Sequence, residues 1–189
     1  MQALQVLSLT LLSVLAASAQ TFVSGKCPNP PVQANFNVAR YLGRWYEIEK
    51  LPAIFQKGEC GQATYSLKSP GAVAVLNEEL LVDGRVNGVT GTAKVKDPAE
   101  PAKLEVSFFE NQPPGPYWVL STDYDNYTLV YACTNYFNLY HVEFSWILSR
   151  ERTLSADTME ELRSILRSHN VSVDKLQVTD QSDCSSMPE

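Results

Sequence analysis

The residues best suited to chemistry are cysteines and histidines, and their spacing limits what they can do. They are Cys27, Cys60, Cys133, Cys184, His141 and His169. A zinc site needs closely spaced ligand pairs, but the cysteines form no C-x-x-C pair and the histidines stand apart. An even number of widely spaced cysteines predicts two disulfides, in any of three pairings, in an oxidising compartment. We therefore expect neither a metal nor another cofactor.

The sequence lacks the usual catalytic motifs. It has no G-x-S-x-G, G-x-x-x-x-G-K-[ST], H-E-x-x-H or G-x-G-x-x-G pattern. His141 falls on the polar side of a predicted strand, so we expect an exposed imidazole, and His169 ends a predicted helix. Asp123 and Asp125 lie in a predicted turn, where an Asx-turn explains them better than paired acid–base catalysis. These observations argue against an enzyme.

The first residues predict export. Residues 4–17 form an almost unbroken apolar run that ends in Ala17-Ser18-Ala19, which is typical of a signal peptide over residues 1–19 with cleavage before Gln20. A membrane anchor is disfavoured because the run is shorter than the roughly 20 residues that span a bilayer. We therefore expect a secreted, extracellular protein, which agrees with the expected disulfides.

The remaining chain, residues 20–189, has the length of a single domain. The whole sequence has 189 residues, of which 44% are hydrophobic, and a net charge of −6. The acidic balance argues against nucleic acid as a partner and against purely electrostatic binding to anionic membranes.

Alternation of apolar and polar residues predicts the strands that would position the side chains. Eight runs rich in Val, Leu, Tyr, Phe and Thr are separated by turn signals such as Ser69-Pro70-Gly71. The runs cover residues 45–50, 62–68, 72–81, 86–96, 103–108, 117–121, 127–133 and 139–148. A meander of this length tends to close and so to remove its exposed edges. We predict an all-β fold with one flanking α-helix, in which an eight-stranded antiparallel up-and-down β-barrel covers about residues 43–150.

The periodicity changes after the barrel. Ser155 is a candidate N-cap for a helix over about residues 155–169. Its apolar face consists of Met159, Leu162, Ile165 and Leu166. This face predicts packing against the barrel wall. A short strand near residues 176–178 and a tail to residue 189 complete the predicted domain.

Three separated motifs carry a family resemblance. They are Gly43-Arg44-Trp45, Thr122-Asp123-Tyr124 and the segment from Trp146 to Arg150. In this order, in a secreted β-rich chain, they resemble the three signature regions of the lipocalin family, and the resemblance covers nearly the whole mature chain. Further segments at residues 26–32, 45–50, 100–106 and 144–148 resemble a lipid-carrying branch of that family.

The resemblance implies a barrel with one closed end and one open mouth. Trp45 would close the barrel and the Arg150 guanidinium would stack on it, a contact worth roughly 0.5–2 kcal/mol. The residues that it implies to be structural are Gly43, Trp45, Thr122, Asp123, Tyr124 and Arg150. It also implies the disulfides Cys27–Cys133 and Cys60–Cys184.

Strand parity predicts the side chains that face the barrel interior. The candidate ligand-binding residues are Tyr65, Val75, Asn77, Phe108, Tyr117, Leu129, Phe144 and Trp146. Aromatic walls with a few polar groups suit a small apolar molecule with one polar end, although some of these side chains could simply fill the barrel. With no inward Lys or Arg expected, a fatty acid should keep its carboxylate at the wet mouth.

The resemblance implies a monomeric lipid carrier for fatty acids such as arachidonic acid and steroids such as progesterone. Two alternatives are a prostaglandin-isomerase-type lipocalin, which needs an unpaired inward thiol, and a module that binds proteins through its loops. Large apolar residues gather in three predicted open-end loops: Ile54, Phe55, Phe109, Pro113, Pro114, Tyr136 and Phe137. Either they fold back over the pocket or they contact a lipoprotein particle or a membrane surface. Two N-x-[ST] sequons predict N-glycosylation at Asn126 and Asn170.

Overall fold

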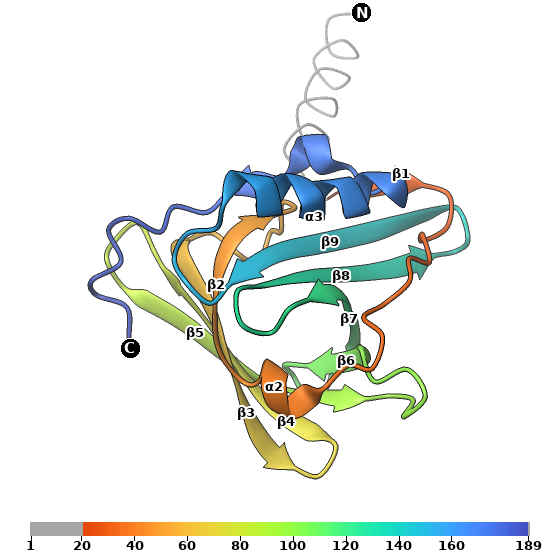
Figure 1. Ribbon diagram of the computed structural model, residues 1–189, viewed down its shortest axis with the longest axis horizontal. Helices are drawn as coiled ribbons and strands as arrows, with labels where there is room; N and C mark the ends of the chain where they lie inside the picture. The colour runs from red at the N-terminus through yellow and green to blue at the C-terminus, as the bar shows by residue number, and fades with distance from the viewer. Residues whose placement is uncertain (1–20, 189) are drawn as a thin grey trace, which may run out of the picture.

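A single antiparallel sheet, closed on itself, dominates the computed structural model, which describes residues 21–188 (Figure 1). Its barrel strands are β2 (Gly43–Lys50), β3 (Glu59–Ser69), β4 (Ala72–Leu80), β5 (Val86–Val95), β6 (Lys103–Ser107), β7 (Gly115–Thr122), β8 (Tyr127–Tyr136) and β9 (Tyr140–Ser149). Each strand pairs with the next, and β9 also pairs with β2. This last pairing closes the barrel and confirms the predicted fold class.

Two short strands extend the sheet beyond the closed barrel. β1 (Thr21–Ser24) pairs with β9, and β10 (Gln177–Val178) pairs with Glu49 and Lys50 at the C-terminal end of β2. β1 was not predicted, because a four-residue strand gives too short a pattern to read. The expected signal peptide, residues 1–19, and its cleavage site before Gln20 lie outside the described residues.

The helices cover two different surfaces of the barrel. α3 (Ala156–Ser168) begins after Ser155, whose side chain accepts a hydrogen bond from the Thr158 N–H, and lies along the outside of β8 and β9 (Figure 1). The short α2 (Val38–Tyr41), capped by Asn37, lies at one end of the barrel. A 3₁₀ turn, η1 (Val173–Lys175), connects α3 to β10. No helix among residues 21–188 has the length and apolar character needed to cross a membrane.

Two apolar cores lie on opposite sides of the barrel wall. The inner core contains Trp45, Tyr65, Val75 and Val130, among others. The outer core lies between the wall and α3, and contains Leu129, Tyr131, Ile147, Met159, Leu162 and Leu166. Strand β8 is therefore apolar on both faces, with Val130 in the inner core and Leu129 and Tyr131 in the outer core, as expected for a strand covered on both sides.

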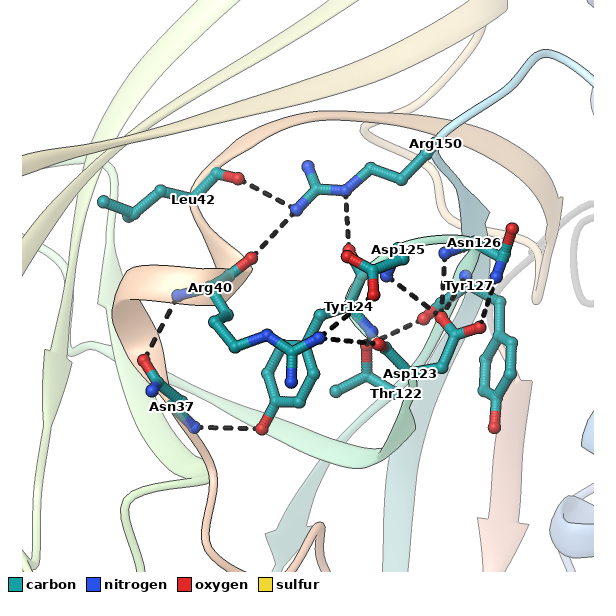
Figure 2. A network of polar contacts seen from close by, with 10 residues as sticks. All are labelled: Asn37, Arg40, Leu42, Thr122, Asp123, Tyr124, Asp125, Asn126, Tyr127 and Arg150. Atoms are coloured by element: carbon teal, nitrogen blue, oxygen red, sulfur yellow. Dashed lines mark hydrogen bonds and ion pairs between the residues drawn. The ribbon is translucent and has the colours of Figure 1, made fainter.

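The closed end is organised around Arg150. Its guanidinium carbon lies 3.7 Å from the centre of the Trp45 ring, and its N–H groups donate to the carbonyl oxygens of Leu42 (2.9 Å), Arg44 (2.6 Å) and Tyr124 (3.0 Å). Figure 2 shows this guanidinium between α2 and the β7–β8 turn. A planar group with five donors suits this position, because several carbonyls converge on it from three segments.

The β7–β8 turn is an Asx-type structure, as the sequence predicts. The Asp123 carboxylate accepts hydrogen bonds from the backbone N–H groups of Asp125, Asn126 and Tyr127 (Figure 2). Partial burial would by itself raise the pKa of Asp123, but these bonds and one from the Asn126 side chain outweigh it and lower that pKa.

Both disulfides tie terminal segments to the barrel. Cys27 is joined to Cys133 on β8, and Cys60 on β3 is joined to Cys184 in the C-terminal tail. This is the pairing that the family resemblance implies. All four cysteines of the sequence are therefore oxidised.

Candidate ligand site in the barrel interior

All but one of the predicted pocket residues lie on the inner face. Tyr65 and Val75 belong to the inner core, and Phe108, Tyr117 and Trp146 pack against it. Asn77 lies opposite Ala63 of the inner core in the β3–β4 pairing, so it shares that face. Phe144 stacks on Trp146 with ring centres 5.9 Å apart. The structure therefore brings these side chains, which come from four strands and from the residue that follows β6, to one interior.

Leu129 was wrongly assigned to the pocket. It is fully buried, but it lies in the outer core with Leu162 and Leu166 of α3. The apolar residues of β8 occupy both parities, so alternation could not decide which face points inward. Its neighbour Val130 is the residue that reaches the inner core.

Three tyrosines form a hydrogen-bonded cluster deep in the barrel. The Tyr117 hydroxyl lies 2.8 Å from the Tyr41 hydroxyl and 2.7 Å from the Tyr65 hydroxyl. Burial raises the pKa of Tyr41 to about 12 and also raises the pKa values of Tyr65 and Tyr117. The three hydroxyls therefore stay neutral at physiological pH and form a polar cluster among the apolar side chains of the inner core. Tyr41, on α2 outside the predicted strands, was not predicted.

The aromatic wall depends on one glycine. The Phe108 ring crosses β5 at Gly91, where an added Cβ would come within 2.7 Å of the ring. Such a contact is closer than packed carbon atoms tolerate. The absence of a side chain at Gly91 therefore leaves room for the Phe108 ring on the inner side.

A polar network, which the sequence analysis missed, lies where the C-terminal end of β2 meets the β2–β3 loop. The Lys50 ammonium donates to the Glu47 carboxylate at 2.6 Å, and both side chains are buried. Gln56, from the β2–β3 loop, donates to Glu47 at 2.7 Å and accepts from the Trp146 indole N–H at 2.8 Å. The Thr179 hydroxyl donates to Glu47 at 2.6 Å. One carboxylate thus connects β2, the mouth loop and the C-terminal segment.

The strand register places this ion pair on the inner face. Lys50 lies opposite Trp146 and Glu47 lies opposite Leu148, and both partners belong to the inner side. An irregularity between Glu47 and Glu49 shifts the register, so two residues three apart can share a face. The expectation that no Lys or Arg faces inward is therefore wrong. The bulge between Glu47 and Glu49, which turns Lys50 inward, leaves no pattern in the sequence from which it could be predicted.

The outward face of β9 is also more buried than its sequence suggests. His141 is buried, not exposed, and its Nδ1 lies 3.0 Å from the Gly25 carbonyl oxygen. Glu143, which is fully buried, accepts a hydrogen bond from the Tyr131 hydroxyl. The exposed imidazole was expected from the polar parity of His141, but segments far away in the sequence lie against this face: the Gly25 carbonyl after β1 contacts His141, and the Ser172 N–H after α3 donates to Glu143.

The mouth loops expose large apolar side chains. Phe55 is 57% exposed although it contacts Phe144, Phe109 is 56% exposed and Phe137 is 84% exposed. Ile54, Tyr136, Pro113 and Pro114 are exposed as well, and so is Val82 in the β4–β5 loop, which was not predicted. In an up-and-down barrel these loops, which follow alternate strands, lie at the same end. These side chains therefore do not fold back completely over the barrel interior, because more than half of the surface of Phe55, Phe109 and Phe137 stays exposed.

Comparison with known proteins places these features in a family. Residues 36–181 match the model of a lipocalin-like domain. Apolipoprotein D of Cavia porcellus is 55% identical over 181 residues, which cover 93% of this chain and 96% of that protein. The Lazarillo protein of Schistocerca americana is 33% identical over 93% of this chain and 82% of its own length. Insecticyanin from the tobacco hornworm Manduca sexta has a similar structure, with a TM-score of 0.76 and 26% identity, over 89% of this chain and 93% of that one.

Proposed function

This chain belongs to the lipocalin family as an apolipoprotein D-like member, and it carries small hydrophobic ligands. From that premise we propose that it is secreted and transports fatty acids such as arachidonic acid and steroids such as progesterone. One observation supports this ligand class above all. A closed barrel places Tyr65, Tyr117, Phe144 and Trp146 on its inner side, where aromatic faces surround a few polar groups. That combination suits a lipid with a single polar end.

Tryptophan substitutions test the interior as the ligand site. Trp146→Ala should weaken progesterone binding by about 1–3 kcal/mol, because apolar contact with the ligand is lost. Trp118→Ala is the matched control, because Trp118 packs against the outer core and under the Lys103 ammonium. Equal affinities for the two folded variants, measured by titration calorimetry, would remove Trp146 from the site. Native mass spectrometry of secreted protein identifies the lipid carried in vivo.

The exposed mouth loops support docking on a lipoprotein particle or membrane surface, from which a ligand could enter without crossing water. Each inserted aromatic side chain would contribute roughly 1.5–3 kcal/mol at full burial. Because the net charge is −6, this association should respond only weakly to salt. Phe55→Ser combined with Phe137→Ser should reduce flotation with phosphatidylcholine vesicles.

The control for docking is Leu67→Ser, because Leu67 is 67% exposed on β3 near the β3–β4 hairpin, at the opposite end of the barrel. Loss of flotation in this control as well would show that surface apolarity in general, and not the mouth, drives association. Unchanged flotation of the double variant would eliminate docking through these loops.

A thiol-dependent isomerase is a weaker candidate, because all four cysteines are in disulfides. Titration of the native protein with a thiol reagent tests this point, and a reactive inward thiol would revive the isomerase alternative.

We also propose signal cleavage before Gln20, a single domain over residues 20–189 and a monomeric state, each measurable on secreted protein. Both sequon acceptors, Asn126 and Asn170, are exposed, and a mass shift on glycosidase treatment would demonstrate their glycosylation.

A further inference from the structure

We propose that the Glu47–Lys50 pair is a recognition site inside the barrel for the uncharged, hydrogen-bond-accepting end of a lipid, and that it disfavours a carboxylate at that position. The inference rests on the proposed carrier function and assigns the chemistry of the ligand end. Hydroxyl and ketone oxygens are the acceptors that it would select. A fatty acid would bind with its carboxylate kept at the mouth.

The pair lies on the ligand side of the wall. Lys50 is opposite Trp146, whereas its neighbours Glu49 and Leu51 face the helix side, where Glu49 binds Arg163 of α3 and Leu51 lies in the outer core. Trp146 stacks on Phe144 and touches Gln56. An apolar ligand lying against the aromatic wall would therefore have Lys50 beside it.

Donor and acceptor capacity in the network is unequal. The Glu47 carboxylate already accepts hydrogen bonds from three donors, the side chains of Lys50, Gln56 and Thr179. An ammonium group has three N–H donors, and within residues 21–188 the structure gives Lys50 one side-chain acceptor, Glu47. The group that remains available is therefore a donor, which suits an oxygen acceptor on the ligand.

The charges on the inner side disfavour an anion. Glu47 compensates the charge of Lys50. A second buried carboxylate, Glu79, shares the parity of Val73 and Val75 on β4 and accepts hydrogen bonds from the backbone N–H groups of Lys57 and Gly58 in the mouth loop. The Lys57 side chain is exposed. Two carboxylates thus oppose one ammonium, and a ligand carboxylate would add a third negative charge in a poorly solvated space.

The experiment compares two probes that differ only at the polar end, decanoate and 1-decanol, by titration calorimetry at pH 7.4. Wild-type protein should bind 1-decanol more tightly than decanoate. Glu47→Gln leaves the Lys50 charge uncompensated and should shift the decanoate-to-decanol affinity ratio toward decanoate by about tenfold or more. Lys50→Met should weaken 1-decanol binding.

Glu49→Gln is the matched control, because it alters a buried, ion-paired carboxylate of the same strand on the outer face. It should leave the ratio unchanged. Tighter decanoate binding by the wild type, or a ratio that Glu47→Gln does not alter, would overturn the proposal while leaving the carrier function intact. Failure of both probes to bind the wild type would overturn the carrier function as well. If Glu47→Gln does not fold, the wild-type ratio and Lys50→Met still decide.

Discussion

Replacing Arg150 with lysine should destabilise the barrel although the charge is kept. The guanidinium makes its three shortest hydrogen bonds to the carbonyl oxygens of Arg44, Leu42 and Tyr124, at 2.6, 2.9 and 3.0 Å, and it covers the Trp45 ring. A lysine ammonium can reach one of these carbonyls but cannot span all three, because all of its N–H donors are on one nitrogen atom, whereas the guanidinium has donors on three.

The magnitude follows from the contacts that are lost. Two hydrogen bonds from a charged donor, at about 1.5 kcal/mol each, and part of the cation–π contact give a loss of about 3–4 kcal/mol. For a domain of this size, that loss lowers Tm by about 10 °C. Urea unfolding followed by tryptophan fluorescence, with both disulfides intact, measures the change in the free energy of unfolding.

The matched control is Arg152→Lys. Arg152 also lies over an aromatic ring, that of Tyr46 at 4.5 Å, but its guanidinium donates one side-chain hydrogen bond, to Gln181 at 2.7 Å. Lysine can reproduce most of this arrangement, so the expected loss is below about 1 kcal/mol. If Arg150→Lys costs no more than this control, the carbonyl contacts do not hold the closed end together and the reasoning is refuted.

Three further predictions concern the turn, the outer core and the disulfides. Asp123→Asn should lower the free energy of unfolding by about 1 kcal/mol at pH 7. Because the folded-state pKa of Asp123 is lowered, this contribution of Asp123 to stability is present above about pH 4 and is lost as the pH falls through the lowered pKa. If this is wrong, urea titrations at several pH values will show a constant difference in stability between wild type and variant. Leu129→Ala should cost about 2–5 kcal/mol in thermal unfolding but leave progesterone affinity unchanged, since its contacts are with α3; weakened binding would return it to the pocket. Removing the Cys27–Cys133 bridge by double substitution to serine should cost about 4–5 kcal/mol in denaturant unfolding, because the bridge closes a loop with a sequence separation of 106, and an unchanged midpoint would show that loop closure contributes little here.

Strand and helix positions were predictable because they depend on local patterns. Alternation with a period of two, interrupted by turn residues, marked all eight barrel strands to within a few residues of their observed ends. Ser155 followed by a helical stripe marked the start of α3. The short elements β1 and α2 escaped prediction, because four residues are too few to show a period.

The sequence by itself determined which residues alternate, where the strands turn and which aromatic residues of β3, β7 and β9 lie on the inner face. Only the tertiary structure decided which face points inward when both faces are apolar, as for Leu129, and which polar residue is buried, as for His141 against the Gly25 carbonyl. It also decided that Lys50 faces the interior, through an irregular register between Glu47 and Glu49. The physical reason is common to all three. A strand's own residues specify its alternation, but its register and the elements that cover it depend on segments far away in the chain.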